Sequence, residues 1–367
     1  MMEPDFETLI GLVSHYSPSG QEHNAVEWLV RRMNSIGYDN ARIDEAGNAV
    51  GIIGDGPKQV VLLGHIDTVP GEIMVRRIVN PPINDRRDAI PHYDVLYGRG
   101  TVDAKGPLAC FVDAAARVGI REGWQFVVIG AVEEERDSEG ARFVAEQYKP
   151  DFAVIGEPSQ WDRITLGYKG SAWSNVTVRR SQAHSASGEQ TASEAAVESW
   201  LAIKAYVESF NAGKRNTFDK LLLTLRGMES GSEDFEQWAR LHVGVRLPVD
   251  VSPKDWYSIL KEIAHQAAVE GAGFAIPAWA CEKNTLLVRT FLKAIRSLGG
   301  EPRFVHKTGT ADLNIVAPVW NCPAVVYGPG DSALDHTPEE HIPLGEYANA
   351  VSILSHVLCN LSEGTPA

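Results

Sequence analysis

The sequence has few cysteines and no long apolar segment. Its four cysteines, Cys110, Cys281, Cys322 and Cys359, lie far apart and include no C-x-x-C pair, which argues against a disulfide framework and against a cysteine-bound zinc ion. The longest apolar stretches, such as residues 126–132, are much shorter than the roughly 20 residues that span a bilayer. The first ten residues carry three acidic side chains and no basic leader. We therefore expect a cytoplasmic protein without a membrane span or a signal peptide.

Basic residues are in the minority. The 367 residues include 34 Lys and Arg against 48 Asp and Glu, a formal net charge of −14. The phosphate backbone of a nucleic acid is repelled by such a charge and is not an expected partner. The segment 163–226 is an exception, because its nine basic and five acidic residues give a local charge of +4. This segment is suited to receive an acidic partner.

The composition and the apolar pattern predict an α/β fold. Apolar residues make up 44% of the chain and charged residues 22%, which is ordinary for a globular protein. At the start of the chain, Ser19 and Glu22 form a capping-box pattern ahead of an amphipathic helix. Short apolar runs separated by helical segments predict buried strands. These runs lie at residues 60–63, 126–132, 152–155 and 324–327.

The middle of the chain has a different pattern. Residues 172–178 and 241–247 alternate as half-exposed strands do, and residues 193–210 and 253–268 have helical spacing. Two such strand-plus-helix units predict a separate α+β domain, which we expect to be inserted because candidate site residues lie on both sides of it. The predicted boundaries are 1–165 with 279–367 for a discontinuous catalytic domain, and 166–278 for the insertion.

Polar side chains follow the predicted strands. Because open α/β sheets bind their ligands beyond the carboxyl ends of the strands, we expect these side chains to share one site. Taken alone, each has a simpler explanation, such as a capped strand end or a solvated acidic loop. The residues are His65 and Asp67 after the first run, Glu133, Glu134 and Glu135 after the second, Glu157 after the third and His336 after the fourth.

Histidine and carboxylate side chains without cysteine suit a catalytic zinc site. A bridging carboxylate can hold two metal ions about 3.5–4 Å apart, and such a pair activates water and polarises a carbonyl group. A further glutamate that binds no metal is then needed as a general base, which passes the proton of the water to the leaving nitrogen. Adjacent glutamates can divide the tasks of metal ligand and base.

Five motifs follow one another along the chain. They are G-H-I-D-T-V-P at 64–70, Y-G-R-G-T-V-D-A-K-G-P at 97–107, the three glutamates with Ser138 and Gly140 behind them, G-E-P at 156–158 and D-H-T-P at 335–338. In this order they resemble the motifs of the co-catalytic dinuclear zinc amidohydrolases and metallopeptidases, the family of acetylornithine deacetylase, succinyl-diaminopimelate desuccinylase and carboxypeptidase G. The resemblance implies a zinc-peptidase-like catalytic domain with a mainly parallel central sheet, and an inserted lid or dimerisation domain.

The same resemblance implies two zinc ions per subunit, for which cobalt can substitute. His65, Asp103 and Glu157, which we call the first donor set, would bind one ion. Asp103, Glu135 and His336, which we call the second donor set, would bind the other. Asp103 then bridges the two ions.

Two neighbouring carboxylates take other roles in this resemblance. Asp67 would orient His65, since metal-bound histidines need a carboxylate partner, and Glu134 would be the general base. The family usually has Asp-Glu-Glu where this chain has three glutamates, so the register rests on Ser138 and Gly140. A shift by one residue would make Glu133 the base.

The inserted domain and the segment after it supply further candidates. The resemblance implies that His184 stabilises the oxyanion, in its own subunit or across the interface of a homodimer. Arg246 matches a basic position that holds a substrate carboxylate, with a surface arginine as the alternative. We also expect substrate contacts from Lys307, Thr308 and Gly309.

Within the family, three segments are most similar to the lysine- or ornithine-releasing hydrolases that act on an acidic amino-group carrier protein. They are Y-K-G at 168–170, K-T-G-T-A-D at 307–312 and Y-G-P-G-D-S at 327–332. The resemblance implies release of lysine or ornithine from this carrier in lysine or arginine biosynthesis. The alternatives are a small-molecule N-acyl amino acid deacylase, an aminopeptidase, and a binding protein without catalysis. The last is disfavoured because every expected ligand and Glu134 are present.

Overall fold

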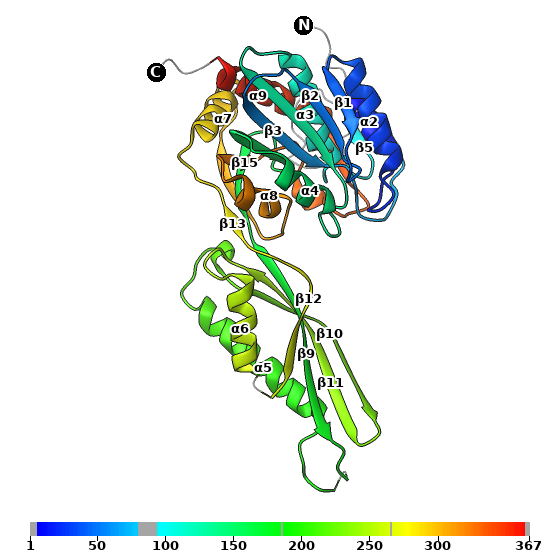
Figure 1. The fold of residues 1–367 in the computed structure, drawn as a ribbon, viewed down its shortest axis with the longest axis vertical. Helices are drawn as coiled ribbons and strands as arrows, with labels where there is room; N and C mark the ends of the chain where they lie inside the picture. The colour runs from blue at the N-terminus through cyan, green and yellow to red at the C-terminus, as the bar shows by residue number, and fades with distance from the viewer. Residues whose placement is uncertain (1–5, 80–93, 185, 265, 364–367) are drawn as a thin grey trace. The chain divides into compact units, whose positions relative to one another are not determined.

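The computed structural model describes residues 6–79, 94–184, 186–264 and 266–363, and the chain forms two compact units (Figure 1). The large unit comprises the chain up to Gly167, Cys281–Val305 and the residues from Ala311 onward, and the inserted unit comprises Tyr168–Ala280 and His306–Thr310. The ends of the predicted catalytic domain, residues 1–5 and 364–367, lie outside the described residues.

The four apolar runs form adjacent parallel strands in the sheet of the large unit. Residues 60–63 are fully buried, and strands that are covered on both faces have unbroken apolar runs instead of alternation. The predicted α/β fold with parallel central strands is confirmed. In spatial order these strands are β6 (Trp124–Ala131), β3 (Lys58–His65), β7 (Phe152–Gly156) and β15 (Ala324–Val326).

Antiparallel strands flank these four, so the sheet is mixed. β2 (Ala49–Ile53) pairs with β6, β1 (Asn40–Ile43) pairs with β2, and β8 (Arg163–Tyr168) pairs with β15. β14 (Arg303–Lys307) pairs with β8. A separate small antiparallel sheet contains β4 (Arg76–Ile78), β5 (Val95–Tyr97) and β16 (His341–Pro343).

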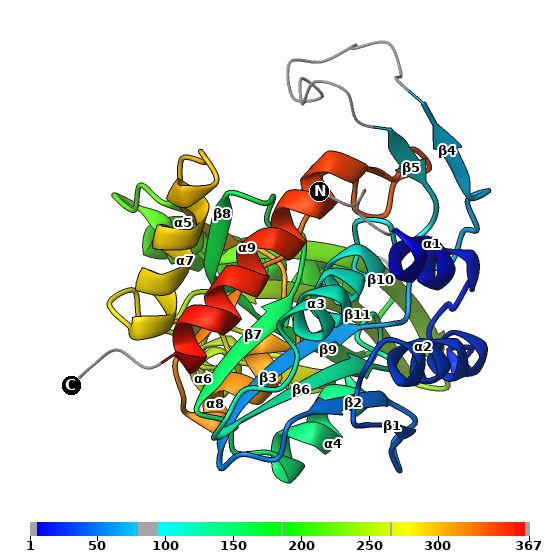
Figure 2. The ribbon, with the colours of Figure 1, turned by 90° about the horizontal axis from the view of Figure 1, so that it is seen from above.

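Helices cover both faces of the main sheet. In Figure 2, α3 (Lys105–Val118) and α9 (Leu344–Ser362) lie on one face and α4 (Glu139–Gln147) on the other. Leu108 and Phe111 of α3 are fully buried in the core. The other helices of this unit are α1 (Glu7–Ser14), α2 (His23–Ser35), α7 (Leu286–Ser297) and α8 (Leu313–Trp320). None of the described helices is both long and apolar enough to cross a membrane.

The capping box predicted at the start of α2 is wrong. The helix begins at His23, and its N-cap residue, Glu22, makes no side-chain capping bond. The Ser19 hydroxyl instead donates to the Asp67 carboxylate (2.7 Å), and the Glu22 carboxylate accepts from the Gly20 N–H (2.8 Å). A tertiary hydrogen bond to a buried carboxylate therefore replaces the local one.

The inserted unit is an antiparallel sheet with helices on one face (Figure 1). The predicted strands and helices are β9 (Gly170–Ser181), α5 (Ala192–Asn211), β11 (Glu236–Leu247) and α6 (Pro253–Ile263). The sequence pattern missed two edge strands, β10 (Leu222–Glu233) and β12 (Ala268–Ile276), because most of their side chains are not buried. The short strand β13 (Trp279–Ala280) follows.

The segment His306–Thr310 groups with the inserted unit, although the sequence-based boundaries assign it to the catalytic domain. The Lys169 N–H donates to the Lys307 carbonyl oxygen (3.3 Å), and the Arg246 guanidinium donates to the Thr310 hydroxyl (3.1 Å). These bonds join residues that are far apart in the sequence, so no local pattern could predict them.

Candidate metal centre

The ends of the parallel strands gather polar side chains at one edge of the main sheet. β3 ends at His65, which pairs with Ala131 at the end of β6, and Gly64 pairs with Gly156 at the end of β7. The three glutamates follow β6 and Glu157 follows β7. The parallel register therefore places the segments that carry these residues next to one another, as expected for a site beyond strand carboxyl ends.

The first donor set converges on the His65 ring. The His65 Nε2 atom lies 3.2 Å from an Asp103 carboxylate oxygen and 4.0 Å from a Glu157 carboxylate oxygen. His65 is 1% exposed and Glu157 is also buried. Donor atoms of His65, Asp103 and Glu135 lie within 4.8 Å of one another.

The second donor set converges on the same aspartate. The His336 Nε2 atom lies 3.0 Å from the other Asp103 oxygen and 3.1 Å from a Glu135 oxygen. Asp103 thus presents one carboxylate oxygen to each histidine, which is the arrangement that a bridging ligand requires. The His336 backbone has φ 61°, a left-handed conformation that is uncommon for a residue other than glycine.

Asp67 contacts both His65 and the glutamate turn. The His65 Nδ1 atom lies 2.9 Å from the Asp67 carbonyl oxygen and 3.5 Å from its carboxylate. The fully buried Asp67 carboxylate accepts the N–H groups of Glu134 (3.0 Å) and Glu135 (3.1 Å). Burial would raise the pKa of Asp67, but its hydrogen bonds with His65 and Ser19 lower it. Asp67 therefore stays ionised and fixes the ring and the turn together.

The three adjacent glutamates point to different partners. The Glu133 carboxylate faces Arg136 at 3.8 Å, whereas the Glu135 carboxylate faces His336. Burial raises the pKa of Glu134 well above its usual range, and the negative charge of Glu157 raises it further, although His65 opposes this. A carboxyl group with a raised pKa beside candidate metal ligands has the property that a general base needs.

The residues present fit a pair of metal ions. Hydrogen bonds to Asp103 and Glu135 raise the pKa of His336 to about 10. Burial alone would lower the pKa of His65, but its hydrogen bonds to Asp103 and Asp67 raise it well above the ordinary value. The neighbouring carboxylates thus favour positive charge at both histidines, and a metal ion supplies such charge in place of the protons when it binds. Imidazole nitrogens and carboxylate oxygens without sulfur are ligands that suit zinc.

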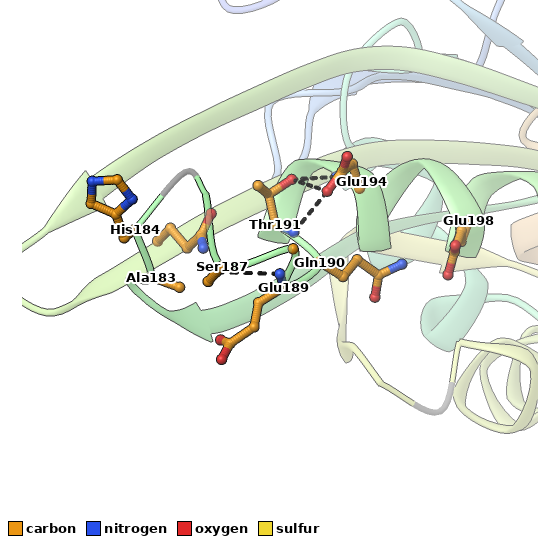
Figure 3. Close-up of a pocket in the computed structure, with 10 residues that line it drawn as sticks. Ala183, His184, Ser187, Glu189, Gln190, Thr191, Glu194 and Glu198 are labelled. Carbon is orange, nitrogen blue, oxygen red and sulfur yellow. Dashed lines mark hydrogen bonds between the residues drawn. The ribbon is translucent and has the colours of Figure 1, made fainter.

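The remaining predicted site residues lie in the inserted unit. His184 is exposed in the loop between β9 and α5, at one end of a pocket of about 550 Å³ whose lining continues along α5 to Glu198 (Figure 3). Arg246 lies on β11, and Lys307, Thr308 and Gly309 lie at the end of β14 and after it. The described contacts do not bring them to the donor sets, so their roles stay predictions.

Sequence reasoning missed several buried charged residues of the large unit, among them Arg99, Glu340 and Asp312. Arg99 and Glu340 form an ion pair (2.8 Å), and both lie inside motifs or directly after one. Asp312 is 2% exposed, and burial raises its pKa to about 7. Asp312 is the last residue of the K-T-G-T-A-D segment, so the family motif contained it, but no local pattern indicated that its side chain is buried.

Comparison with known proteins identifies the family of the chain. Residues 61–360 match peptidase family M20/M25/M40, and the chain belongs to this family. It is therefore a hydrolase, so the predicted family and enzyme class are confirmed.

Two curated relatives and one solved structure illustrate the relationship. The chain is 40% identical over 364 residues to a "[LysW]-lysine hydrolase" of Deinococcus radiodurans, covering 96% of this chain and 95% of the relative. It is 29% identical over 344 residues to a "[LysW]-lysine/[LysW]-ornithine hydrolase" of Saccharolobus islandicus, covering 93% and 91%. Its fold is similar to that of the Bacillus subtilis YXEP protein, described as a dinuclear metal binding peptidase of the M20 family, with a TM-score of 0.68, 13% identity and 98% coverage of both chains.

Proposed function

We propose that this protein hydrolyses the amide that joins lysine to an amino-group carrier protein, in lysine biosynthesis. The observation that carries the proposal is the arrangement of two histidines around Asp103, one carboxylate oxygen to each, in a chain similar over its length to a "[LysW]-lysine hydrolase". The likeness to a "[LysW]-lysine/[LysW]-ornithine hydrolase" supports ornithine as a second product, and with it a part in arginine biosynthesis. The proposed location is cytoplasmic, on the grounds of cysteine usage.

Two zinc ions are the proposed cofactors, and cobalt is expected to substitute. The first donor set would hold one ion and the second donor set the other, with Asp103 shared. When bound, the pair supplies positive charge that acidifies water and polarises the scissile carbonyl group. Asp67 holds His65 in the orientation that this requires.

Glu134 is the proposed general base. Its carboxylate takes a proton from the attacking water and delivers it to the leaving α-amino nitrogen of lysine. The register is supported by the neighbouring side chains, since Glu133 faces Arg136 and Glu135 faces His336. Glu134 is the member of the three that remains for this role.

The inserted unit is proposed to complete the site and to form a homodimer. His184 would donate a hydrogen bond to the developing oxyanion, in its own or in the partner subunit, and Arg246 would bind the α-carboxylate of the released amino acid. Lys307, Thr308 and Gly309 would contact the substrate beside it. Val197 (44% exposed) and Leu201 (55% exposed) lie one turn apart on α5, and we propose this helix face as the contact with the second subunit. Leu201→Glu should then shift the protein to a monomer in size-exclusion chromatography with light scattering.

The basic segment 163–226 gives weaker support for carrier docking than its charge predicts. Lys169 is buried and donates to the carbonyl oxygen of Phe218 (2.8 Å). Arg179 forms an ion pair with Glu236 (3.2 Å). These two cations already have partners within the chain, which makes them less available to an acidic carrier protein. This observation favours the alternative, a small-molecule N-acyl amino acid deacylase or aminopeptidase, which needs no basic docking surface.

An activity panel tests the proposal. Purified enzyme loaded with zinc is assayed on carrier-linked lysine, carrier-linked ornithine, acetyl-lysine, acetylornithine and succinyl-diaminopimelate, with the Glu134→Gln protein as the inactive control. We expect the highest kcat/KM on a carrier-linked substrate. A higher kcat/KM on a free acyl amino acid would replace the proposal with the small-molecule alternative, and inactivity throughout would contradict both.

A further inference from the structure

A fully buried carboxylate lies directly behind Asp103. The Glu340 side chain is 0% exposed. One of its carboxylate oxygens accepts the backbone N–H groups of Val102 (2.9 Å) and Asp103 (3.1 Å). The backbone position of Asp103 is therefore fixed by a residue that is 237 positions further along the chain.

Arg99 connects this carboxylate to two other segments. Its guanidinium forms the ion pair with the second Glu340 oxygen (2.8 Å) and donates to the Thr337 carbonyl oxygen (3.2 Å). Its Nε atom donates to the Gly71 carbonyl oxygen (2.8 Å). The planar guanidinium offers several donors in a fixed geometry, so one buried Arg99 can hold three backbone segments together.

These three segments carry candidate ligands of the metal centre. Gly71 follows the motif that contains His65, Arg99 and Glu340 hold the turn before Asp103, and Thr337 is the residue after His336. The pair thus anchors two members of the second donor set through the backbone. Of the first donor set, only Asp103 has a described backbone bond to the pair at the ligand itself or at its next neighbour.

We propose that Arg99 and Glu340 are positioning residues that align Asp103 with His336 and thereby set the affinity of the second donor set for its metal ion. This inference rests on the proposed dinuclear centre. Neither residue touches a donor atom of an expected ligand in the described contacts, so the pair acts through the backbone that carries those ligands.

Loss of either partner has two physical consequences. The remaining charge is left buried without its partner, which is unfavourable. Loss of the Glu340 carboxylate weakens the acceptor of the Val102 and Asp103 N–H groups. Loss of the Arg99 guanidinium removes the donor to the Thr337 carbonyl oxygen. In either case the turn before Asp103 is free to shift. Removing an outer partner of a metal site typically lowers metal affinity by about 10–100-fold.

The test measures metal binding by the whole protein. Metal-free wild type, Glu340→Gln and Arg99→Lys are titrated with zinc in competition with a chromophoric chelator, and with cobalt by absorption spectroscopy. Asp113→Asn is the matched control, because the Asp113 carboxylate also lies inside the large unit and accepts hydroxyl hydrogen bonds from Thr8 and Tyr347. His65→Ala and His336→Ala provide the spectra of forms that lack a ligand of the first or the second donor set.

We expect wild type to bind two ions, and Glu340→Gln and Arg99→Lys to bind one of them about 10–100-fold more weakly. The cobalt spectrum of their one-metal form should match that of His336→Ala and differ from that of His65→Ala. Asp113→Asn should lower the melting temperature, because Thr8 and Tyr347 lose a charged acceptor, and should bind both ions as wild type does. If Glu340→Gln does not fold, Arg99→Lys, which keeps the charge, carries the test.

Two results would overturn the inference. Unchanged affinity for both ions in Glu340→Gln and Arg99→Lys, with a melting temperature lowered as in Asp113→Asn, would make the pair a structural feature only. If the cobalt spectrum of the one-metal form of Glu340→Gln or Arg99→Lys matches that of His65→Ala, the pair supports the first donor set and not the second. Wild type that binds fewer than two ions would instead contradict the proposed dinuclear centre itself.

Discussion

The donor sets of the large unit and the His184 loop of the inserted unit are held in very different ways. His65 lies at the end of a buried parallel strand and is 1% exposed. His184 lies in an exposed loop, where its Nδ1 atom accepts the N–H of Ala186 two residues away (3.1 Å). The fold therefore holds His65 in a buried place, whereas His184 is exposed, and on our proposal substrate or a second subunit would fix its position.

The largest effect is expected from removal of the metal ions, because both donor sets converge on one carboxylate, Asp103. Strong chelation should abolish hydrolysis, and zinc or cobalt should restore it. His65→Ala, Asp103→Ala and His336→Ala should each lower the metal content measured by mass spectrometry, with the greatest loss for the shared Asp103. The exposed His356 of α9 is the control, and His356→Ala should keep the wild-type content. Full activity of a protein proven to be metal-free would refute the centre.

The next largest effect separates the three glutamates. Glu134→Gln should keep both metal ions and lose about 10²–10⁴ in kcat, since an amide cannot accept the proton. Glu135→Gln should lose metal from the second donor set. Glu133→Gln, whose carboxylate faces Arg136, should stay close to wild type in both respects. A large loss of kcat in Glu133→Gln with full metal content would mean that the register is shifted by one residue.

A smaller loss is expected in the inserted unit. His184→Ala should reduce kcat by about 10²–10³, the usual effect of removing an oxyanion donor, without changing the metal content. Subunits carrying His184→Ala are then mixed with subunits carrying Glu134→Gln. Recovered activity would show that His184 acts in the partner's site, because one hybrid site holds both intact groups. No recovery despite proven subunit exchange would place it in its own subunit's site.

The smallest effect concerns stability against pH, and its sign differs between the units. Burial raises the pKa of Glu346 in α9 to about 7, so its favourable contribution is present below the unfolded pKa and is lost as pH rises through about 7. The free energy of unfolding of Glu346→Gln, relative to that of wild type, should therefore be about 1–3 kcal/mol higher at pH 8 than at pH 5.

Glu194 of α5 is the opposite case. Its hydrogen bonds with the Thr191 N–H and hydroxyl lower its pKa. Its contribution is present above the unfolded pKa and is lost as pH falls through the folded value, so Glu194→Ala should lower the melting temperature at pH 7 and matter little at pH 3. Calorimetry of both variants from pH 3 to pH 8 measures these changes in stability. If stability relative to wild type changes in the same direction with pH in both variants, the opposite pKa shifts of Glu346 and Glu194 are contradicted.

Local sequence patterns predicted the parallel strands because strands buried on both faces have unbroken apolar runs. They missed β10 and β12, whose side chains are mostly not buried, and misread Ser19 as a helix cap although its hydroxyl donates to Asp67. The partners Arg99 and Glu340 also escaped, since nothing local links residues 241 positions apart. Sequence reasoning therefore found the groups that follow strands, and the structure was needed for the contacts that align them.

A crystal structure of the zinc-loaded protein, with anomalous data at the zinc edge, tests the dinuclear centre most directly. We expect two zinc peaks about 3.5–4 Å apart, one on each side of the Asp103 carboxylate, with His65 and Glu157 on the first and His336 and Glu135 on the second. A single peak, or two peaks that do not share Asp103, would contradict this centre.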